Sequence, residues 1–272
     1  FNLWPHATWS DSTVNIGESS NHYSDDELKA LIAHEAAHTV DGTALYPHNY
    51  GNDGHHYVSE VTDRRTAWIE GWAIYNGGLF NQSDTKRMSS ATCGLRRETE
   101  ESAPNDPIYD ELQRAHFMTT LRNEGTVAAI LTNIDGNGVH RDKILDTFKS
   151  GNQNWEKESL ANRDIVSFTL DYMEANPEQT IRTMLAIDCA TRFKASDERL
   201  TKLFGPFALE YLKERDKYRS DYYEENQLDK YFCNNTIDFF TKWDGKQSEQ
   251  TIGESDDTEV QLDPMTLLNQ NS

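Results

Sequence analysis

The chain has few cysteines, and they form no pattern that would hold a metal. Cys93, Cys189 and Cys233 are the only three in 272 residues, and none belongs to a C-x-x-C pair. Structural zinc sites built from thiolates normally use closely spaced cysteine pairs. The sequence therefore excludes a cysteine zinc finger or ribbon. It leaves open one disulfide together with a free thiol.

Basic side chains are scarce as well. Lys and Arg number 26 against 46 Asp and Glu, which gives a formal net charge of -20 at pH 7. Binding to nucleic acid depends largely on Lys and Arg that neutralise phosphates, so we expect no nucleic-acid partner. Acidic side chains at the surface keep a protein soluble. They also slightly favour basic or neutral substrates.

Long apolar runs are missing. No stretch approaches the roughly 18 residues that a membrane-spanning helix needs, so we expect no membrane span. No basic, hydrophobic leader is seen, and the first residue is Phe1 rather than Met, which indicates a removed leader or a start inside a longer polypeptide. Two N-x-S/T sequons begin at Asn81 and Asn234. Together these features favour a secreted protein, extracellular or at the cell surface.

Helical patterns dominate what is present. Ser24 is a candidate N-cap and Gly42 a candidate stop, so we predict a helix over about residues 25–40. The segment TDRRTAWIEGWAIYNGGLF predicts a second helix over about 62–76, interrupted by a Gly-Gly pair at 77–78.

A helical lobe is expected over about residues 108–225. The predicted helices of this lobe are Ile108–Asn123, Glu124–Asn133, Arg141–Lys149, Asp164–Glu174, Pro177–Arg192 and Leu200–Glu225. Near the N-terminus, Ser12–Gly17 alternates apolar and polar residues and predicts one strand. Residues 245–272 are acidic and nearly free of aromatics, so we predict a disordered tail after one domain at 1–244. The expected fold class is α+β and predominantly helical.

The stretch H-E-A-A-H at residues 34–38 predicts a zinc-binding helix. Positions four apart lie on one helix face, so His34 and His38 can direct their imidazoles at one point. Glu35 lies about 100 degrees round the helix, where its carboxylate can reach a water activated by zinc. A chance H-E-x-x-H has a probability of roughly a few per cent in this chain. Its position on a well-capped helix argues further against coincidence.

A catalytic zinc usually has three protein ligands and an open position, so two histidines are not enough. After His38 the sequence places Asp41 and Ala44 where the longer H-E-x-x-H-x-x-G-x-x-H motif needs Gly and His. The histidines of the polar segment at 41–60 are interpreted as solvated. The better candidate is Glu70 in WIEGWAIY, because a carboxylate among buried aromatics needs a partner.

The combination of H-E-A-A-H with E-G-W-A at residues 70–73 resembles the gluzincin zinc peptidases, in which a second helix behind the first donates a glutamate. The resemblance implies that His34, His38 and Glu70 are the zinc ligands and that Glu35 is the general base. It also implies a zincin-like fold with a helical C-terminal lobe. The N-terminal strand region would be minimal, since only about 24 residues precede the zinc helix.

Further features concern the surroundings of the site. Gly71 and Ala73 would let the second helix approach the first closely. By the same resemblance, the strand at TVNIG would be an edge that pairs with an extended peptide. Glu124 stands in a phrase similar to one in some secreted peptidases of this type. It is a group that contacts a ligand rather than the metal, a rival third ligand, or simply a favourable charge at a helix start. The candidate donors to an oxyanion are Tyr109, His116, His140 and Tyr172.

These observations predict a secreted zinc metallo-endopeptidase that hydrolyses peptide or protein substrates with Zn²⁺ as its cofactor. An alternative is a surface or envelope-associated binding module that keeps the zincin scaffold without proteolysis. A degenerate scaffold usually loses the base or a ligand, whereas this chain retains all four candidates.

Overall fold

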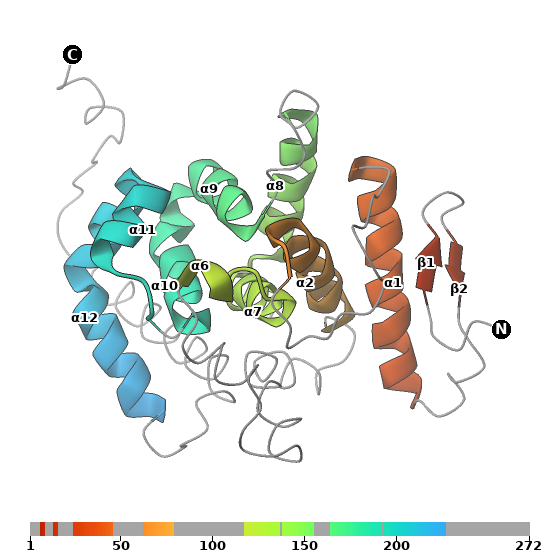
Figure 1. Cartoon of the computed structure of the whole chain (residues 1–272), viewed down its shortest axis with the longest axis horizontal. Coiled ribbons are helices and arrows are strands. Elements are labelled where there is room, and N and C mark those ends of the chain that lie inside the picture. The colour runs from red at the N-terminus through yellow and green to blue at the C-terminus, as the bar shows by residue number, and fades with distance from the viewer. Residues whose placement is uncertain are drawn as a thin grey trace, which may run out of the picture.

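The computed structural model describes residues 6–8, 13–15, 24–45, 62–78, 117–136, 138–154, 164–191 and 193–226, and these are mostly helical (Figure 1). The elements are β1 (His6–Thr8), β2 (Thr13–Asn15), α1 (Asp25–Leu45), α2 (Arg64–Gly78), α6 (Phe117–Thr120), α7 (Glu124–Asp135), α8 (Arg141–Asn154), α9 (Ile165–Ala175), η3 (Pro177–Gln179), α10 (Thr180–Ala190), α11 (Asp197–Phe204) and α12 (Pro206–Asn226). No helix within these ranges combines the length and apolar character that a membrane crossing requires.

Helix α2 is the central element, packed between α1 and the rest of the helical body (Figure 1). One face carries aromatic rings: Trp72 stacks on Phe148 of α8 with centroids 4.4 Å apart, and Trp68 lies 5.0 Å from the ring of Phe168 on α9. Such ring pairs contribute beyond the area that they bury. They fix the position of α2 in the core.

The two strands form a small antiparallel hairpin in which Ala7 pairs with Val14. The hairpin packs against α1, on the side away from α2 (Figure 1). Strand β2 falls within the predicted Ser12–Gly17 segment. Its partner β1 has no alternating apolar pattern in three residues and was not predicted.

The N-terminus of α2 has a clear side-chain cap. The Asp63 carboxylate accepts hydrogen bonds from the backbone N–H groups of Arg65 (2.9 Å) and Thr66 (3.0 Å) and from the Thr66 hydroxyl (2.6 Å). Burial works against the charged carboxylate, but the hydrogen bonds outweigh it and lower the pKa of Asp63. The cap sets the start of the helix that carries Glu70.

Both ends of α7 are also satisfied. Asn123 caps its start, accepting from the backbone N–H of Thr126, and Gly136 ends it in the left-handed conformation at φ 58°. The Arg182 side chain of α10 donates to the carbonyls of Asn133 and Ile134 at 2.8–3.1 Å. The last carbonyls of α7 thus receive donors that the helix itself cannot supply.

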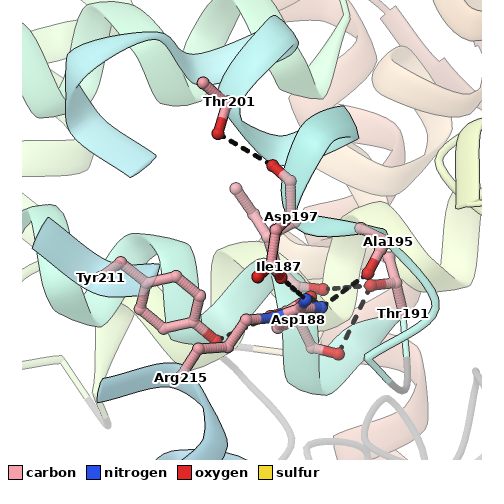
Figure 2. Close-up of polar contacts among 8 residues, drawn as sticks. All are labelled: Ile187, Asp188, Thr191, Ala195, Asp197, Thr201, Tyr211 and Arg215. Carbon is pink, nitrogen blue, oxygen red and sulfur yellow. Dashed lines mark hydrogen bonds and ion pairs between the residues drawn. The ribbon is translucent and has the colours of Figure 1, made fainter. Parts of the chain in front are cut away.

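The C-terminal helices are joined by a buried ion pair (Figure 2). Arg215 of α12 binds both carboxylate oxygens of Asp188 on α10, with Nε–Oδ2 and Nη2–Oδ1 distances of 2.6 and 3.1 Å. The Tyr211 hydroxyl donates to the same carboxylate at 2.7 Å, and Arg215 also reaches Asp197 on α11 and the Ala195 carbonyl. One guanidinium therefore holds three helices together.

Two predicted helix ends are wrong. The first helix continues through Gly42 to Leu45, and α2 passes through Gly77 to end at Gly78. Glycine inside a helix costs only about 1 kcal/mol, which packing readily offsets. At Gly77 the reason is visible, because the absent side chain lets α1 come close.

Later boundaries differ as well. The segment predicted as Pro177–Arg192 begins as the 3-10 turn η3 before α10. The predicted Leu200–Glu225 helix is two helices, broken at Gly205 with φ 54°. Within the predicted Ile108–Asn123, the described helix is Phe117–Thr120 alone. Residues 108–116 and the predicted acidic tail lie outside the described residues, and the domain division stays a prediction.

Candidate metal centre

Three predicted ligands converge between α1 and α2. The Nε2 atoms of His34 and His38 lie 3.2 Å apart, with the two rings nearly perpendicular at 86°. The Oε2 atom of Glu70 lies 3.3 Å from Nε2 of His38 and 3.6 Å from Nε2 of His34. These residues form the group of potential metal donors that the described part of the chain contains.

The three distances fit the ligand set of a small four-coordinate ion. Zinc binds imidazole nitrogen and carboxylate oxygen at about 2.0–2.2 Å in tetrahedral geometry, which places neighbouring ligand atoms about 3.4 Å apart. The observed edges of 3.2, 3.3 and 3.6 Å match one face of such a tetrahedron. The donor set of two imidazoles and one carboxylate is also that of a catalytic zinc site.

The helical geometry explains why the residues meet. His34 and His38 are one turn apart on α1, so they share a face. Glu70 and Gly77 are seven positions apart on α2 and also share a face, opposite Trp68 and the other aromatic residues of that helix. Because the aromatic face turns into the core, the Glu70 face turns towards α1.

Burial of Glu70 creates the need for a positive partner. The residue is 7% exposed, among Trp68, Ile69 and Trp72 at 1–6%. A buried carboxylate is costly unless it is paired. A cation held between Glu70 and the two histidines would offset this cost.

Exposure is uneven across the cluster. The exposed fraction of the side chain falls from 24% for His34 to 14% for His38 and 9% for Glu70. Solvent therefore reaches the cluster mainly at His34.

Glu35 lies on α1 next to His34 and is itself 8% exposed. It is not among the three grouped donors. It therefore lies outside the group formed by His34, His38 and Glu70, and its role as general base stays a prediction.

Glu124 is the first residue of α7 and is 2% exposed. The grouped donors include Glu70 and not Glu124, although the backbone of Glu124 lies close to α2. A Cβ built on Gly71 would lie 2.8 Å from the Glu124 carbonyl oxygen and 2.5 Å from Val127. The idea that Gly71 admits α1 is thus wrong, because this glycine faces α7.

The glycine that does face α1 was missed from the sequence. A Cβ built on Gly77 would lie 2.9 Å from the carbonyl oxygen of Ala30 and 3.4 Å from Cβ of His34. Its spacing of seven from Glu70 is the signal that could have found it, since such residues share a helix face.

Of the candidate donors to an oxyanion, only Tyr172 and His140 are among the described residues. Tyr172 is fully buried, 6.2 Å from the Phe168 ring, and burial raises the pKa of its hydroxyl. His140 begins the turn into α8, where its backbone N–H donates to the Asp135 carbonyl. Tyr109, His116 and the histidines of 41–60 lie outside the described residues.

Cys189 is a free, buried thiol in α10, and burial raises its pKa. Cys93 and Cys233 lie outside the described residues, so their pairing stays a prediction.

Comparison of the chain with protein-family models, with curated proteins and with solved structures finds no match.

Proposed function

We propose that this protein is a zinc-dependent peptidase of the gluzincin kind, with a zincin-like active site between α1 and α2. The observation that carries the proposal is the convergence of His34, His38 and Glu70 at 3.2–3.6 Å from two helices. The H-E-A-A-H motif alone predicts only two of these donors. A catalytic zinc usually needs a third protein ligand, and Glu70 supplies an anionic one close enough to the two histidines to share an ion with them.

Each ligand has a defined task. His34 and His38 offer neutral nitrogen donors, and Glu70 adds a negative charge that leaves a bound Zn²⁺ with a net charge of one. When bound, zinc supplies Lewis-acid chemistry, since it polarises a carbonyl oxygen and makes water acidic enough to lose a proton near neutral pH. The burial of Glu70 strengthens its attraction to a cation, because little water screens it.

Glu35 is the general base in this proposal. Its place beside His34 lets the carboxylate take a proton from the attacking water and carry it to the departing amine nitrogen. The residue is buried, 8% exposed. The substrate would be a peptide or protein, and we propose that it is met outside the cell.

Cleavage of an unstructured protein substrate, followed by mass spectrometry, tests this function. Glu35→Gln should abolish new cleavage products while the zinc content stays at the wild-type level, because Gln keeps the shape but cannot carry the proton. Glu124→Gln is the matched control, a buried glutamate on α7, and should still cleave. Zinc binding without cleavage in the wild type would favour the alternative, a binding module on the same scaffold.

A further inference from the structure

Two points in the contact between α1 and α2 bear on the site. At one, Glu70 meets His34 and His38; at the other, Gly77 meets Ala30. The later residues of α1 meet the earlier residue of α2, so the two helices are antiparallel here. The two points on α2 are seven residues apart, which is about 10.5 Å along the axis.

The Gly77 contact is too close for any side chain. A Cβ at this position would lie 2.9 Å from the Ala30 carbonyl oxygen, a separation that real Cβ atoms essentially never show. The obstructing atom is backbone within α1, so it cannot swing aside as a flexible side chain would. Relief requires the helices to separate.

The second neighbour of Gly77 is a metal ligand. The same Cβ would lie 3.4 Å from Cβ of His34, which is tighter than most real contacts. Separation of the helices at Gly77 would therefore move His34 relative to Glu70. Metal–ligand distances in credible sites lie within about 0.2 Å of their usual values, so a small movement of His34 is enough to disturb the set.

We infer that Gly77 is a positioning residue for the metal site, and that its missing side chain sets the α1–α2 separation at which Glu70 completes the ligand set. The inference rests on the proposed function. Gly77 touches no metal or substrate; it acts through the backbone of α1 and through His34.

Zinc affinity of Gly77→Ala, measured by competition with a chromophoric chelator, tests the inference. We expect affinity to fall by about 10-fold or more, as when groups that orient metal ligands are changed. Gly77→Val should lose more, because a larger side chain separates the helices further. With Co²⁺ in place of zinc, Gly77→Ala should also lose the visible absorption of a four-coordinate site.

Gly136→Ala is the matched control. It makes the same change at another tightly packed glycine, where an added Cβ would lie 2.6 Å from an Arg182 nitrogen and where none of the three nearest atoms belongs to α1. It should lower stability and leave zinc affinity unchanged. If Gly77→Ala is poorly folded, the zinc affinities of the wild type, Gly77→Ala and Gly136→Ala are compared in sucrose, which favours the compact state.

The outcomes separate the two claims. If folded Gly77→Ala binds zinc as tightly as the wild type, the positioning role is wrong while the metal site stands. If Gly136→Ala loses affinity equally, the effect is one of stability and the inference also fails. If the wild type binds no zinc, the proposed function fails and takes the inference with it.

Discussion

The Nε2 atom of His38 lies 3.3 Å from Oε2 of Glu70, although the two residues are 32 positions apart in the sequence. This separation is longer than a good hydrogen bond and close to the distance between two ligands of one zinc ion. The relationship joins α1 to α2. A metal at this point would stabilise the contact of the two helices.

Zinc should therefore raise the thermal stability of the wild type. A ligand that binds only the folded state at 100 times its dissociation constant adds about 2.7 kcal/mol. We expect a higher unfolding midpoint in zinc, reversed by a chelator. In Glu70→Gln the rise should be much smaller. Circular dichroism on heating gives the unfolding midpoints of both proteins. An equal rise in the wild type and in Glu70→Gln would mean that zinc binds elsewhere.

The cap of α2 predicts a dependence of stability on pH. The pKa of Asp63 is lowered in the folded state, so its contribution is fully present above the unfolded value of about 3.9 and is lost as the pH falls through the folded value. Asp63→Ala should cost about 1 kcal/mol near pH 7. The difference from wild type, measured by urea unfolding, should vanish in acid. A difference that persists there would exclude a charged cap.

The ion pair of Figure 2 predicts unequal effects for its members. Arg215→Met leaves the buried Asp188 carboxylate without its cation and should cost about 3–5 kcal/mol. Asp197 is 69% exposed at its side chain, so Asp197→Asn should cost less than about 1 kcal/mol. The free energy of unfolding is measured by chemical denaturation. Equal losses for Arg215→Met and Asp197→Asn would show that the buried Arg215–Asp188 pair is not the main source of the stabilisation.

Stacking of Trp72 on Phe148 predicts a large cost of truncation. Trp72→Ala removes a ring that is 3% exposed and should destabilise by about 3–5 kcal/mol. Trp72→Phe retains a ring for stacking and should cost less. The free energy of unfolding in guanidinium provides the comparison, and equal losses would indicate that the stacked geometry contributes little.

Gly136→Ala should lower stability for two reasons. The residue has φ 58°, which costs an L-residue about 1–2 kcal/mol, and the new methyl would meet Arg182. Gly205→Ala meets nothing within 4 Å, but with φ 54° and ψ -128° its backbone lies outside the left-handed region of Gly136, so it has a different and larger backbone cost. Thermal melts of Gly136→Ala should show a lower midpoint than the wild type. An unchanged midpoint would mean that both the backbone strain and the contact with Arg182 are relieved at no cost.

The sequence predicted the parts of the site that follow from local rules. His34 and His38 share a helix face because they are four apart, and Glu70 was identifiable as a carboxylate inside an apolar helix. The predominantly helical fold is confirmed for the described residues. The helix ends at Gly42 and Gly77 were wrong, because a glycine stops a helix only when tertiary packing does not continue it.

The relation between helices could not be predicted. That Gly71 faces α7 while Gly77 faces α1 depends on how α2 is rotated in the core, which the contacts of Trp68 and Trp72 decide. These contacts involve rings from α8 and α9, far along the chain. Local patterns give the faces of a helix but not the neighbours of each face.

Elemental analysis tests the metal centre most directly. Wild type, Glu70→Ala and Glu124→Gln would be purified in parallel without added metal, and zinc counted per chain. We predict one zinc in the wild type and in Glu124→Gln, with a large loss in Glu70→Ala. Full occupancy in Glu70→Ala, or no zinc in the wild type, would contradict the site formed by His34, His38 and Glu70.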